Sequence, residues 1–154
     1  MAYWLLKSEP DMFGIDDLAK CQRRTEHWDG VRNYQARNYL RAMRRGDQAF
    51  FYHSSCAAPG VYGVVDIVRA AYPDPSADDP QSPYYDPRST GDNPRWFMVD
   101  VRFQRRLKRP VSLSQIKQTR ALRKLPLVQR GNRLSVMPVS PTEWATILKL
   151  TGEH

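Results

Sequence analysis

The residues best suited to chemistry lie in one stretch, Trp28–Asn38 (WDGVRNYQARN). It holds one indole, a glycine, two arginines, two asparagines and a tyrosine within eleven positions. An aromatic ring can stack on a nucleobase, amides can bond its edge, and guanidinium groups can meet an attached phosphate. A purely structural interpretation is also available, in which Trp28 anchors the core, Asp29-Gly30 forms a turn and Asn33 caps a helix.

Arg37 is the residue of this stretch that a structural interpretation explains least. If Asn33 caps a helix, Arg37 lies in the first turn, where the helix dipole disfavours a cation. Together with Arg32 it indicates an anionic ligand, and the free amides at the start of the helix favour the same ligand. The stretch therefore favours a base or nucleotide, while a sugar or peptide site stays open.

A second stretch, His53-Ser54-Ser55-Cys56, offers the groups of a nucleophilic enzyme. No G-x-S-x-G elbow surrounds the serines. His53 and Ser54 are neighbours on a predicted strand, so their side chains should point to opposite faces. A small hydrolase or base-modifying enzyme that uses His53, Ser54 or Glu9 is therefore the least favoured alternative, and we expect no catalytic residues.

Metal binding has weaker support still. His53 and Cys56 form one H-x-x-C pair, and Cys21 with His27 forms a loose second pair, but the two do not have the spacing of a zinc site. No glycine-rich phosphate loop occurs. We therefore expect neither a metal nor a cofactor. The two cysteines suit a reducing compartment without disulfides.

Positive charge is concentrated in one part of the chain. The formal net charge is +8 and the pI about 9.8, and residues Val101–Thr142 include no Asp or Glu. Such a stretch favours a polyanionic partner. The predicted nucleic-acid surface consists of Arg105, Arg106, Lys108, Arg109, Lys117, Arg120, Arg123, Lys124 and Arg130. Residues 70–94, by contrast, are rich in Pro, Asp and Ser, and we expect an inserted loop there rather than a mobile lid or a partner surface.

Alternating or short apolar runs predict five strands. These are Tyr3–Lys7, Gln48–Ser54, Val61–Arg69, Arg95–Gln104 and Leu134–Val139. Helices are predicted from the Asn33 cap to about Arg44, closed by Gly46, over Ile15–Lys20, from Ser112 or Ser114 through Thr119, over Ala121–Leu125, and from Pro141 onward.

A chain of 154 residues fits a single domain, here 1–154. Strands with helices at the connections, without a βαβ rhythm, predict an α+β fold with a small bent β-barrel or sheet of five to six strands and flanking helices. No apolar run is long enough for a membrane span, and MAYWLLKSEP reads as a first strand rather than a leader. We therefore expect a cytoplasmic protein without a membrane partner.

Six segments in order resemble the EVE domain family: YWLLKSEP, WDGVRNYQARN, FFYHS, GVYGVVDIV, RWFMVDVRF and RLSVMPVSPTEW. The resemblance runs from Tyr3 to about Leu148. It implies a PUA-like fold, a compact β-barrel with flanking helices similar to the YTH domain that reads N6-methyladenine in RNA. It also implies binding of modified bases in DNA, with modified cytosines favoured, and it brings no catalytic activity.

The resemblance also implies which residues line the binding pocket. Trp28 would stack on the base, Asn33 with Ser8 or Ser54 would bond its edge, and Arg32, Arg37 and Arg133 would hold phosphate or a base oxygen. The implied ligand-binding residues are Lys7, Ser8, Glu9, Trp28, Gly30, Val31, Arg32, Asn33, Tyr34, Arg37, Asn38, Tyr52, His53, Ser54, Arg133, Leu134 and Ser135.

The preferred hypothesis is therefore non-catalytic binding of a modified nucleobase, most simply modified cytosine in DNA. The base would be turned out of a duplex or presented in a single strand. The alternative is a PUA-type RNA-binding module acting on tRNA or modified RNA, which the charge and the fold support equally well. DNA and RNA both stay open as the nucleic-acid partner at this point.

Overall fold

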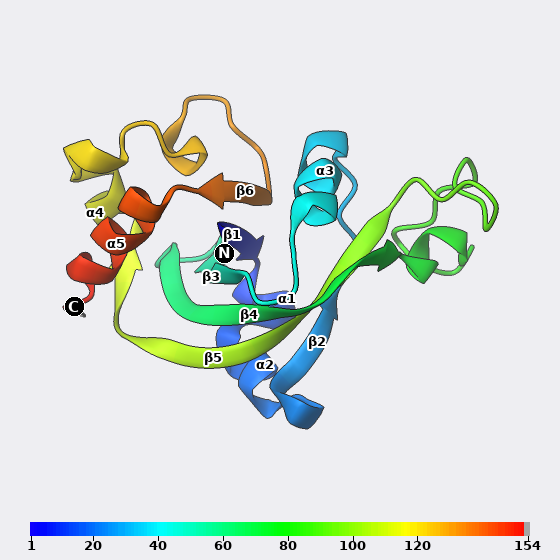
Figure 1. The fold of residues 1–154 in the computed structure, drawn as a ribbon, viewed down its shortest axis with the longest axis horizontal. Helices are drawn as coiled ribbons and strands as arrows, with labels where there is room; N and C mark the ends of the chain where they lie inside the picture. The colour runs from blue at the N-terminus through cyan, green and yellow to red at the C-terminus, as the bar shows by residue number, and fades with distance from the viewer. Residues whose placement is uncertain (153–154) are drawn as a thin grey trace.

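Six β-strands form one mixed sheet in the computed structural model, which describes residues 1–152 (Figure 1). The order across the sheet is β2-β5-β4-β3-β1-β6, with β1 parallel to β3 and every other neighbouring pair antiparallel. The strands are β1 (Tyr3–Ser8), β2 (Thr25–Trp28), β3 (Gln48–His53), β4 (Gly60–Pro73), β5 (Phe97–Ser112) and β6 (Val136–Val139).

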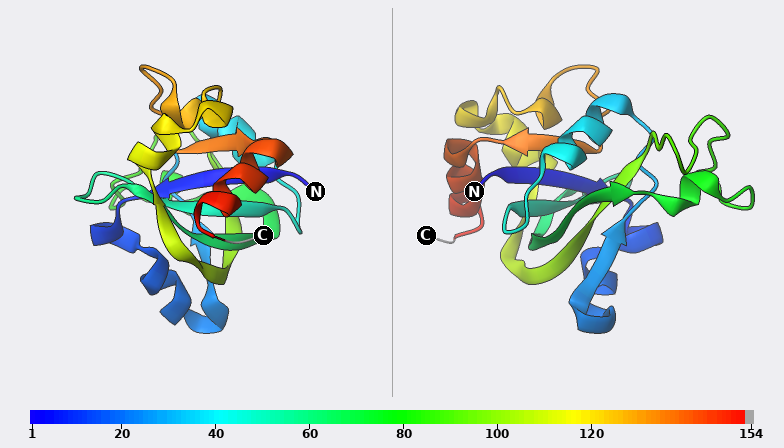
Figure 2. Two further views of the ribbon diagram at one scale, coloured as in Figure 1. Left: turned by 90° about the vertical axis from the view of Figure 1, so that its left-hand side faces the viewer. Right: turned by 45° about the vertical axis from the view of Figure 1, so that its right-hand side comes forward.

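The two longest strands, β4 and β5, bend the sheet. Their pairing shifts register at four places, and each such irregularity increases the local twist. At Gly63 a Cβ would lie 2.7 Å from Cδ1 of Ile15 and 2.9 Å from the carbonyl oxygen of Arg105, so only glycine fits where the bent strand passes under a helix. The result is a strongly curved sheet that wraps around the core (Figure 2). It is open, because β2 and β6 at its two edges are not paired with each other.

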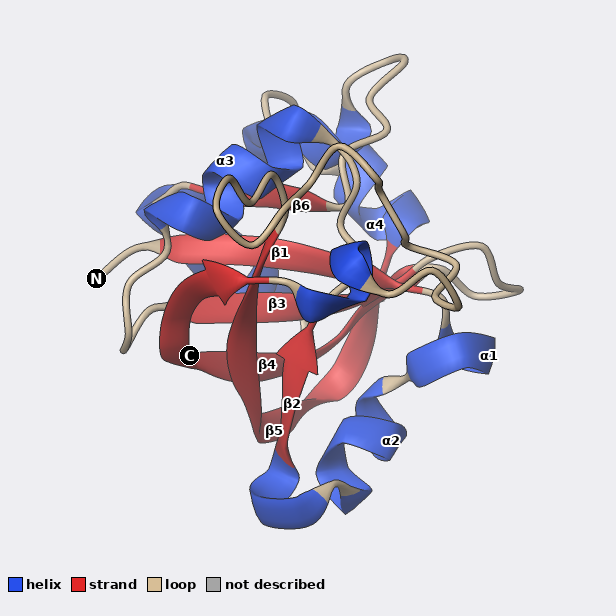
Figure 3. Cartoon of the chain, turned by 90° about the vertical axis from the view of Figure 1, so that its right-hand side faces the viewer, coloured by secondary structure: helices blue, strands red, loops and turns tan. Residues whose placement is uncertain are grey.

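Helices cover the curved sheet at its ends and on its outer side (Figure 3). In Figure 1, α4 and α5 lie at the end of the molecule that holds the C-terminus, and the loop after β4 projects from the opposite end. None of the helices in residues 1–152 is long and apolar enough to cross a bilayer. The helices are α1 (Pro10–Phe13), α2 (Ile15–Lys20), α3 (Tyr34–Ala42), α4 (Leu113–Gln118) and α5 (Pro141–Leu150), with 3-10 turns η1 (Gln22–Arg24), η2 (Pro75–Asp78), η3 (Arg120–Leu122) and η4 (Pro126–Val128).

The helix starts follow the capping residues that the sequence predicts. The Asn33 side chain accepts a hydrogen bond from the backbone N–H of Ala36 at 2.9 Å, which fixes the start of α3. Ser112, not Ser114, caps α4, and Pro141 occupies the first turn of α5. Each cap satisfies backbone groups that the helix leaves open, an effect of about 0.5–2 kcal/mol.

Several features differ from the sequence prediction. The strand β4 continues to Pro73, into the predicted loop, and β5 continues past the predicted end at Gln104 to Ser112. The α3 helix ends at Ala42, and the N–H of Gly46 donates to the carbonyl of Ile67, so this glycine belongs to the turn that leads into β3. The strand β2 and the short helix α1 were not predicted. Both are only four residues long, too short to show a hydrophobic period, and they exist because longer elements pair with or pack against them.

The loop that follows β4 is held in place by two buried carboxylates. Asp74 accepts hydrogen bonds from the backbone N–H groups of Gly30 and Ser76, each at 2.9 Å. Asp86 accepts from Nε1 of Trp96 at 2.7 Å. Burial by itself raises the pKa of Asp74, but the hydrogen bonds from Ser76 and Gly30 and the charge of Arg32 outweigh it and hold that pKa below its ordinary value. The inserted loop is therefore an ordered part of the domain.

Candidate functional site

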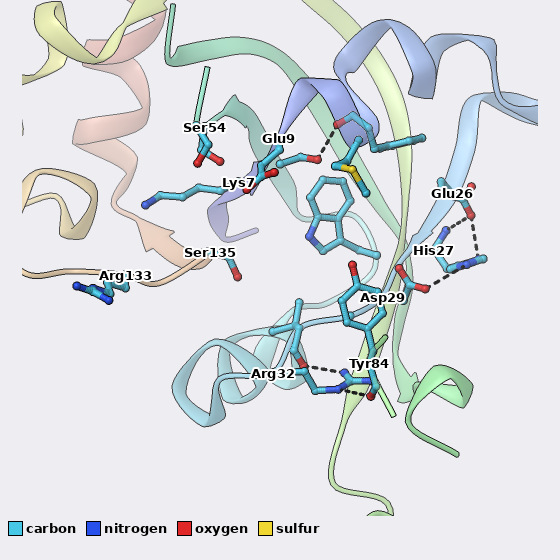
Figure 4. Close-up of a pocket in the computed structure, with 17 residues that line it drawn as sticks. Lys7, Glu9, Glu26, His27, Asp29, Arg32, Ser54, Tyr84, Arg133 and Ser135 are labelled. Atoms are coloured by element: carbon cyan, nitrogen blue, oxygen red, sulfur yellow. Dashed lines mark hydrogen bonds and ion pairs between the residues drawn. The ribbon is translucent and has the colours of Figure 1, made fainter. Parts of the chain in front are cut away.

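A cavity of about 760 Å³ opens between α1, β2 and the loop that follows β4 (Figure 4). Ligand sites for small molecules commonly have volumes of about 300–1,000 Å³, so the cavity can hold one nucleobase with its sugar. The residues that line it are Lys7, Ser8, Glu9, Met12, Phe13, Glu26, His27, Trp28, Asp29, Gly30, Val31, Arg32, Ser54, Ser55, Tyr84, Arg133 and Ser135.

Trp28 is both a core residue and a wall of this cavity. It ends β2, where it pairs with Val99 of β5, and only 8% of it is exposed. Its ring meets Phe51 edge-on at 5.4 Å between centroids and Phe13 edge-on at 6.4 Å. The aromatic contacts therefore anchor the indole in the core at a place where it also lines the cavity. Stacking of Trp28 on a base stays a prediction.

The cavity has a cationic side and an acidic side. Figure 4 shows Lys7 and Arg133 on one side and Glu26 and Asp29 on the other. Partial burial lowers the pKa of Lys7, which means that its charged form would gain from an anion placed beside it. A ligand with a phosphate at one end and a hydrogen-bond donor at the other matches this charge distribution.

On the acidic side, the two carboxylates differ in what they bind. Glu26 lies 2.9 Å from Nδ1 of His27 and also accepts from the backbone N–H of that residue. Asp29 lies 3.8 Å from Nε2 of His27, beyond a hydrogen bond. Burial raises the pKa of Asp29, and the nearby charge of Asp74 raises it further. Asp29 is thus the carboxylate of the pair that is less engaged with His27, and it can accept from a ligand.

The guanidinium group of Arg32 is bound by other groups of the protein. Its Nη1 lies 3.2 Å from the carboxylate of Asp74, its Nη2 donates to Ser76, and its Nε donates to the carbonyl of Tyr84. The guanidinium also lies against the rings of Tyr84 and Trp96. Arg32 thereby fastens the loop after β4 to the segment before α3. It also lines the cavity, and its expected contact with a phosphate stays a prediction.

Arg37, which was expected to meet an anion, is not among the residues that line the cavity. Its guanidinium donates to the carbonyl of Arg95 and to the side chain of Asn38, and it lies over the ring of Tyr34. These contacts, rather than an anionic ligand, account for the cation in the first turn of α3. The other cation expected to meet an anion, Arg133, does line the cavity.

Six further residues that the family resemblance implied also lie outside the cavity. The Asn33 oxygen caps α3, Tyr34 stacks on Trp96 with centroids 4.8 Å apart, and Asn38 binds Arg37. Nor do Tyr52, His53 and Leu134 line it. Those that do are Lys7, Ser8, Glu9, Trp28, Gly30, Val31, Arg32, Ser54, Arg133 and Ser135.

His53 and Ser54 do not form a nucleophile and base. Nε2 of His53 accepts the backbone N–H of Ile15 at 3.1 Å, its ring stacks on Tyr62, and burial lowers its pKa. The imidazole is thus used to hold the start of α2, while Ser54 lines the cavity. Within residues 1–152 no three His, Cys, Asp or Glu side chains are grouped as a metal site would need.

Sequence reasoning missed seven of the lining residues. Asp29 was assigned to a turn, and Glu26 and His27 belong to the strand that no pattern indicated. Tyr84 comes from the inserted loop, whose composition gave no sign that it reaches the site. The missed residues are Met12, Phe13, Glu26, His27, Asp29, Ser55 and Tyr84.

The predicted basic surface is largely separate from the cavity. Of the cations in Val101–Thr142, Arg133 alone lines it in the described chain. Arg106 forms an ion pair with Asp16, 2.7 Å apart. The other basic side chains of the predicted surface lie on β5, on α4 and in or just after η3, and Arg130 lies after η4. They can attract a polyanion to the domain without touching the group that occupies the cavity.

Comparisons with known proteins agree with this architecture. Human thymocyte nuclear protein 1 is 43% identical over 166 residues, which cover 97% of this chain and 73% of that protein. A solved structure of the human THYN1 protein in complex with DNA containing 5-methylcytosine is 42% identical, with a TM-score of 0.95 over 100% of this chain and 99% of that one. A protein from Pseudomonas putida is 55% identical, with a TM-score of 0.94 over 97% of this chain and 99% of that one. The EVE domain matches residues 2–150, and the chain therefore belongs to the EVE-domain family.

Proposed function

We propose that the protein binds a modified base of DNA, with modified cytosine favoured, in the cavity beside Trp28 and without catalysing a reaction. The observation that carries the proposal is the cavity itself: an indole between a cationic and an acidic side, in a chain 42% identical to a protein solved with 5-methylcytosine-containing DNA. The absence of a His53–Ser54 pairing supports binding rather than hydrolysis.

The charges of the cavity suggest one orientation for the base. Lys7 and Arg133 would meet the phosphate that follows the base, since both lie on the same side (Figure 4). The Asp29 carboxylate would accept from the exocyclic amino group of cytosine, a donor that thymine lacks. Ser54 and Ser135 line the cavity on the side of Lys7 and Arg133 as further hydrogen-bonding groups (Figure 4). Ser8 is less available, because its hydroxyl donates to the carbonyl of Phe13 at 2.6 Å.

The proposal is tested by titrating the protein with matched oligonucleotides. The duplexes carry a single cytosine, 5-methylcytosine, 5-hydroxymethylcytosine or N6-methyladenine, and binding is followed by tryptophan fluorescence and anisotropy at several salt concentrations. We expect one modified cytosine to bind most tightly, with a salt dependence that reflects the basic surface. Weak, purely salt-dependent curves that coincide for all duplexes would exclude a base-binding pocket. An RNA of the same sequence decides between DNA and RNA, because a protein that reads the 2′-hydroxyl must distinguish them.

Asp29 gives a sharper test of how the base edge is read. In Asp29→Asn the amide can donate as well as accept, so thymine is no longer rejected. We expect the preference for 5-methylcytosine over thymine, the matched 5-methyluracil base, to fall tenfold or more. This change corresponds to the loss of one base-edge contact of about 1–3 kcal/mol. The measurement is a competition titration between the two duplexes.

Glu26→Gln is the matched control for this test. Glu26 also lines the cavity, but its carboxylate is bonded to His27. We expect this variant to keep the preference of the unmodified protein. An unchanged preference in Asp29→Asn, or the same loss in both variants, would show that Asp29 does not read the base.

A further inference from the structure

Met12 is a large apolar side chain left in solvent at the edge of the cavity. It is 77% exposed and lines the cavity next to Phe13. Isolated exposed apolar residues are common and by themselves mean little. The position of Met12 is different because the backbone that carries it is firmly held and the side chain borders a site.

The short helix α1 acts as a rigid support for Met12. Phe13 points inward, with its ring 6.4 Å from those of both Trp28 and Phe51. The hydroxyl of Ser8 donates to the carbonyl of Phe13, and the N–H groups of Met12 and Phe13 donate to the carbonyl of Glu9. With Phe13 packed partly buried against the core, the neighbouring Met12 points outward and stays exposed.

A second exposed side chain, Tyr84, also lines the cavity. Tyr84 is 40% exposed, and a Cβ on Gly30 would lie 2.7 Å from its ring, so the ring rests directly on the backbone there. Arg32 holds its carbonyl at 2.9 Å. Figure 4 shows the Tyr84 side chain directed toward the interior of the site. The cavity is thus lined by two exposed side chains, Met12 and Tyr84, both carried by backbone that is held by hydrogen bonds.

We propose that Met12 is a wedge that enters the base stack of a DNA duplex and fills the space vacated by the base that turns into the cavity. The inference rests on the proposed function and adds how a paired base becomes accessible. Turning a base out breaks its pairing and stacking, and an apolar side chain inserted at that step replaces part of the lost contact. The unbranched thioether of methionine adapts well to such a gap.

The charges near Met12 are consistent with a contact to bases rather than to phosphates. Glu9 at the N-cap of α1 and Asp11 in its first turn both precede Met12, and their carboxylates would repel the sugar–phosphate backbone. Lys7 and Arg133, on the cationic side of the cavity, are placed to receive the phosphates instead. The thioether of Met12 would therefore be the part of α1 that contacts the bases of the duplex.

The test compares a duplex with a single strand. Met12→Ala and Met12→Leu are titrated with a duplex that carries one 5-methylcytosine and with the same modified strand alone. We expect Met12→Ala to weaken duplex binding about tenfold or more, because unstacking is no longer compensated. Binding of the single strand, which has no pair to open, should stay within about twofold, and Met12→Leu should behave as the unmodified protein. A 2-aminopurine placed next to the modified base reports unstacking by its fluorescence.

Tyr85→Ala serves as the control for loss of an exposed apolar side chain, since Tyr85 is exposed but does not line the cavity. Equal weakening of duplex and single strand by Met12→Ala would make Met12 an ordinary pocket wall and overturn the wedge. Unchanged duplex binding would overturn it as well. If the unmodified protein binds neither modified ligand better than unmodified DNA, the proposed function itself fails. That result differs from the two outcomes for Met12→Ala that overturn the wedge alone.

Discussion

Replacing Trp28 with alanine is expected to lower the free energy of unfolding by about 3–5 kcal/mol, the usual cost of removing a buried aromatic side chain. The indole is nearly buried and packs edge-on against Phe51 and Phe13. Its loss would leave a void between β2, β3 and α1 that the bent sheet cannot close. Urea unfolding at equilibrium measures the change.

Two further variants separate the contribution of Trp28 to protein stability from its contact with a ligand. Phe51→Leu disturbs the same cluster without lining the cavity, so it should lose stability but keep base preference once folded. Trp28→Phe keeps an aromatic core residue, and we expect a smaller loss of stability with a clear loss of affinity for the modified base. Wild-type stability in Trp28→Ala would contradict the packing described above. Unchanged base preference in Trp28→Phe would remove the indole from the ligand contact.

Replacing Asp74 with alanine should have the second large effect, a loss of about 2–3 kcal/mol in unfolding free energy together with loosening of the loop at 70–94. Its carboxylate accepts from Gly30, from Ser76 and from Arg32, whose side chain is 21% exposed. Without the carboxylate these donors lose their shared acceptor, and Tyr84 loses the arginine that holds its carbonyl. Hydrogen exchange in the loop, measured beside urea unfolding, reports both consequences.

Asp78→Ala is the matched control, because Asp78 is exposed in the same loop. The contribution of Asp74 also has a defined pH dependence. Its pKa is lowered in the folded protein, so the contribution is complete above the ordinary value of about 3.9 and is lost as the pH falls through the folded value. The difference in stability between the wild type and Asp74→Ala should therefore shrink below about pH 4. A difference that is constant from neutral to acid pH would mean that the charge of Asp74 does not stabilise the loop.

Much of the fold follows from local sequence patterns. The five predicted strands and the helix that Asn33 caps all exist, because alternation, apolar runs and capping side chains act over a few residues. The short strand β2 escaped prediction for the same reason. Its four residues carry no period, and their conformation depends on pairing with β5, some seventy positions further along the chain.

The candidate site was predictable where its residues belong to the family motifs and unpredictable where it depends on distant partners. Trp28 and Arg133 carry a signal in the sequence and do line the cavity. Arg32 and Arg37 carry the same kind of signal, yet the tertiary structure gives them partners in Asp74 and Arg95. No local pattern shows that a guanidinium group is already engaged by a group more than forty positions away.

The sequence by itself determined that this is an α+β domain of the EVE type with one aromatic and polar stretch and one basic stretch, because composition, periodicity and motif are properties of neighbouring residues. Only the tertiary structure decided which of those polar groups meet in one cavity, since it brings Tyr84 and Asp29 from separate segments to the same site and turns Arg37 away from it. Burial and hydrogen bonds between distant segments decide whether a charged side chain is already bound within the protein or can bind a ligand.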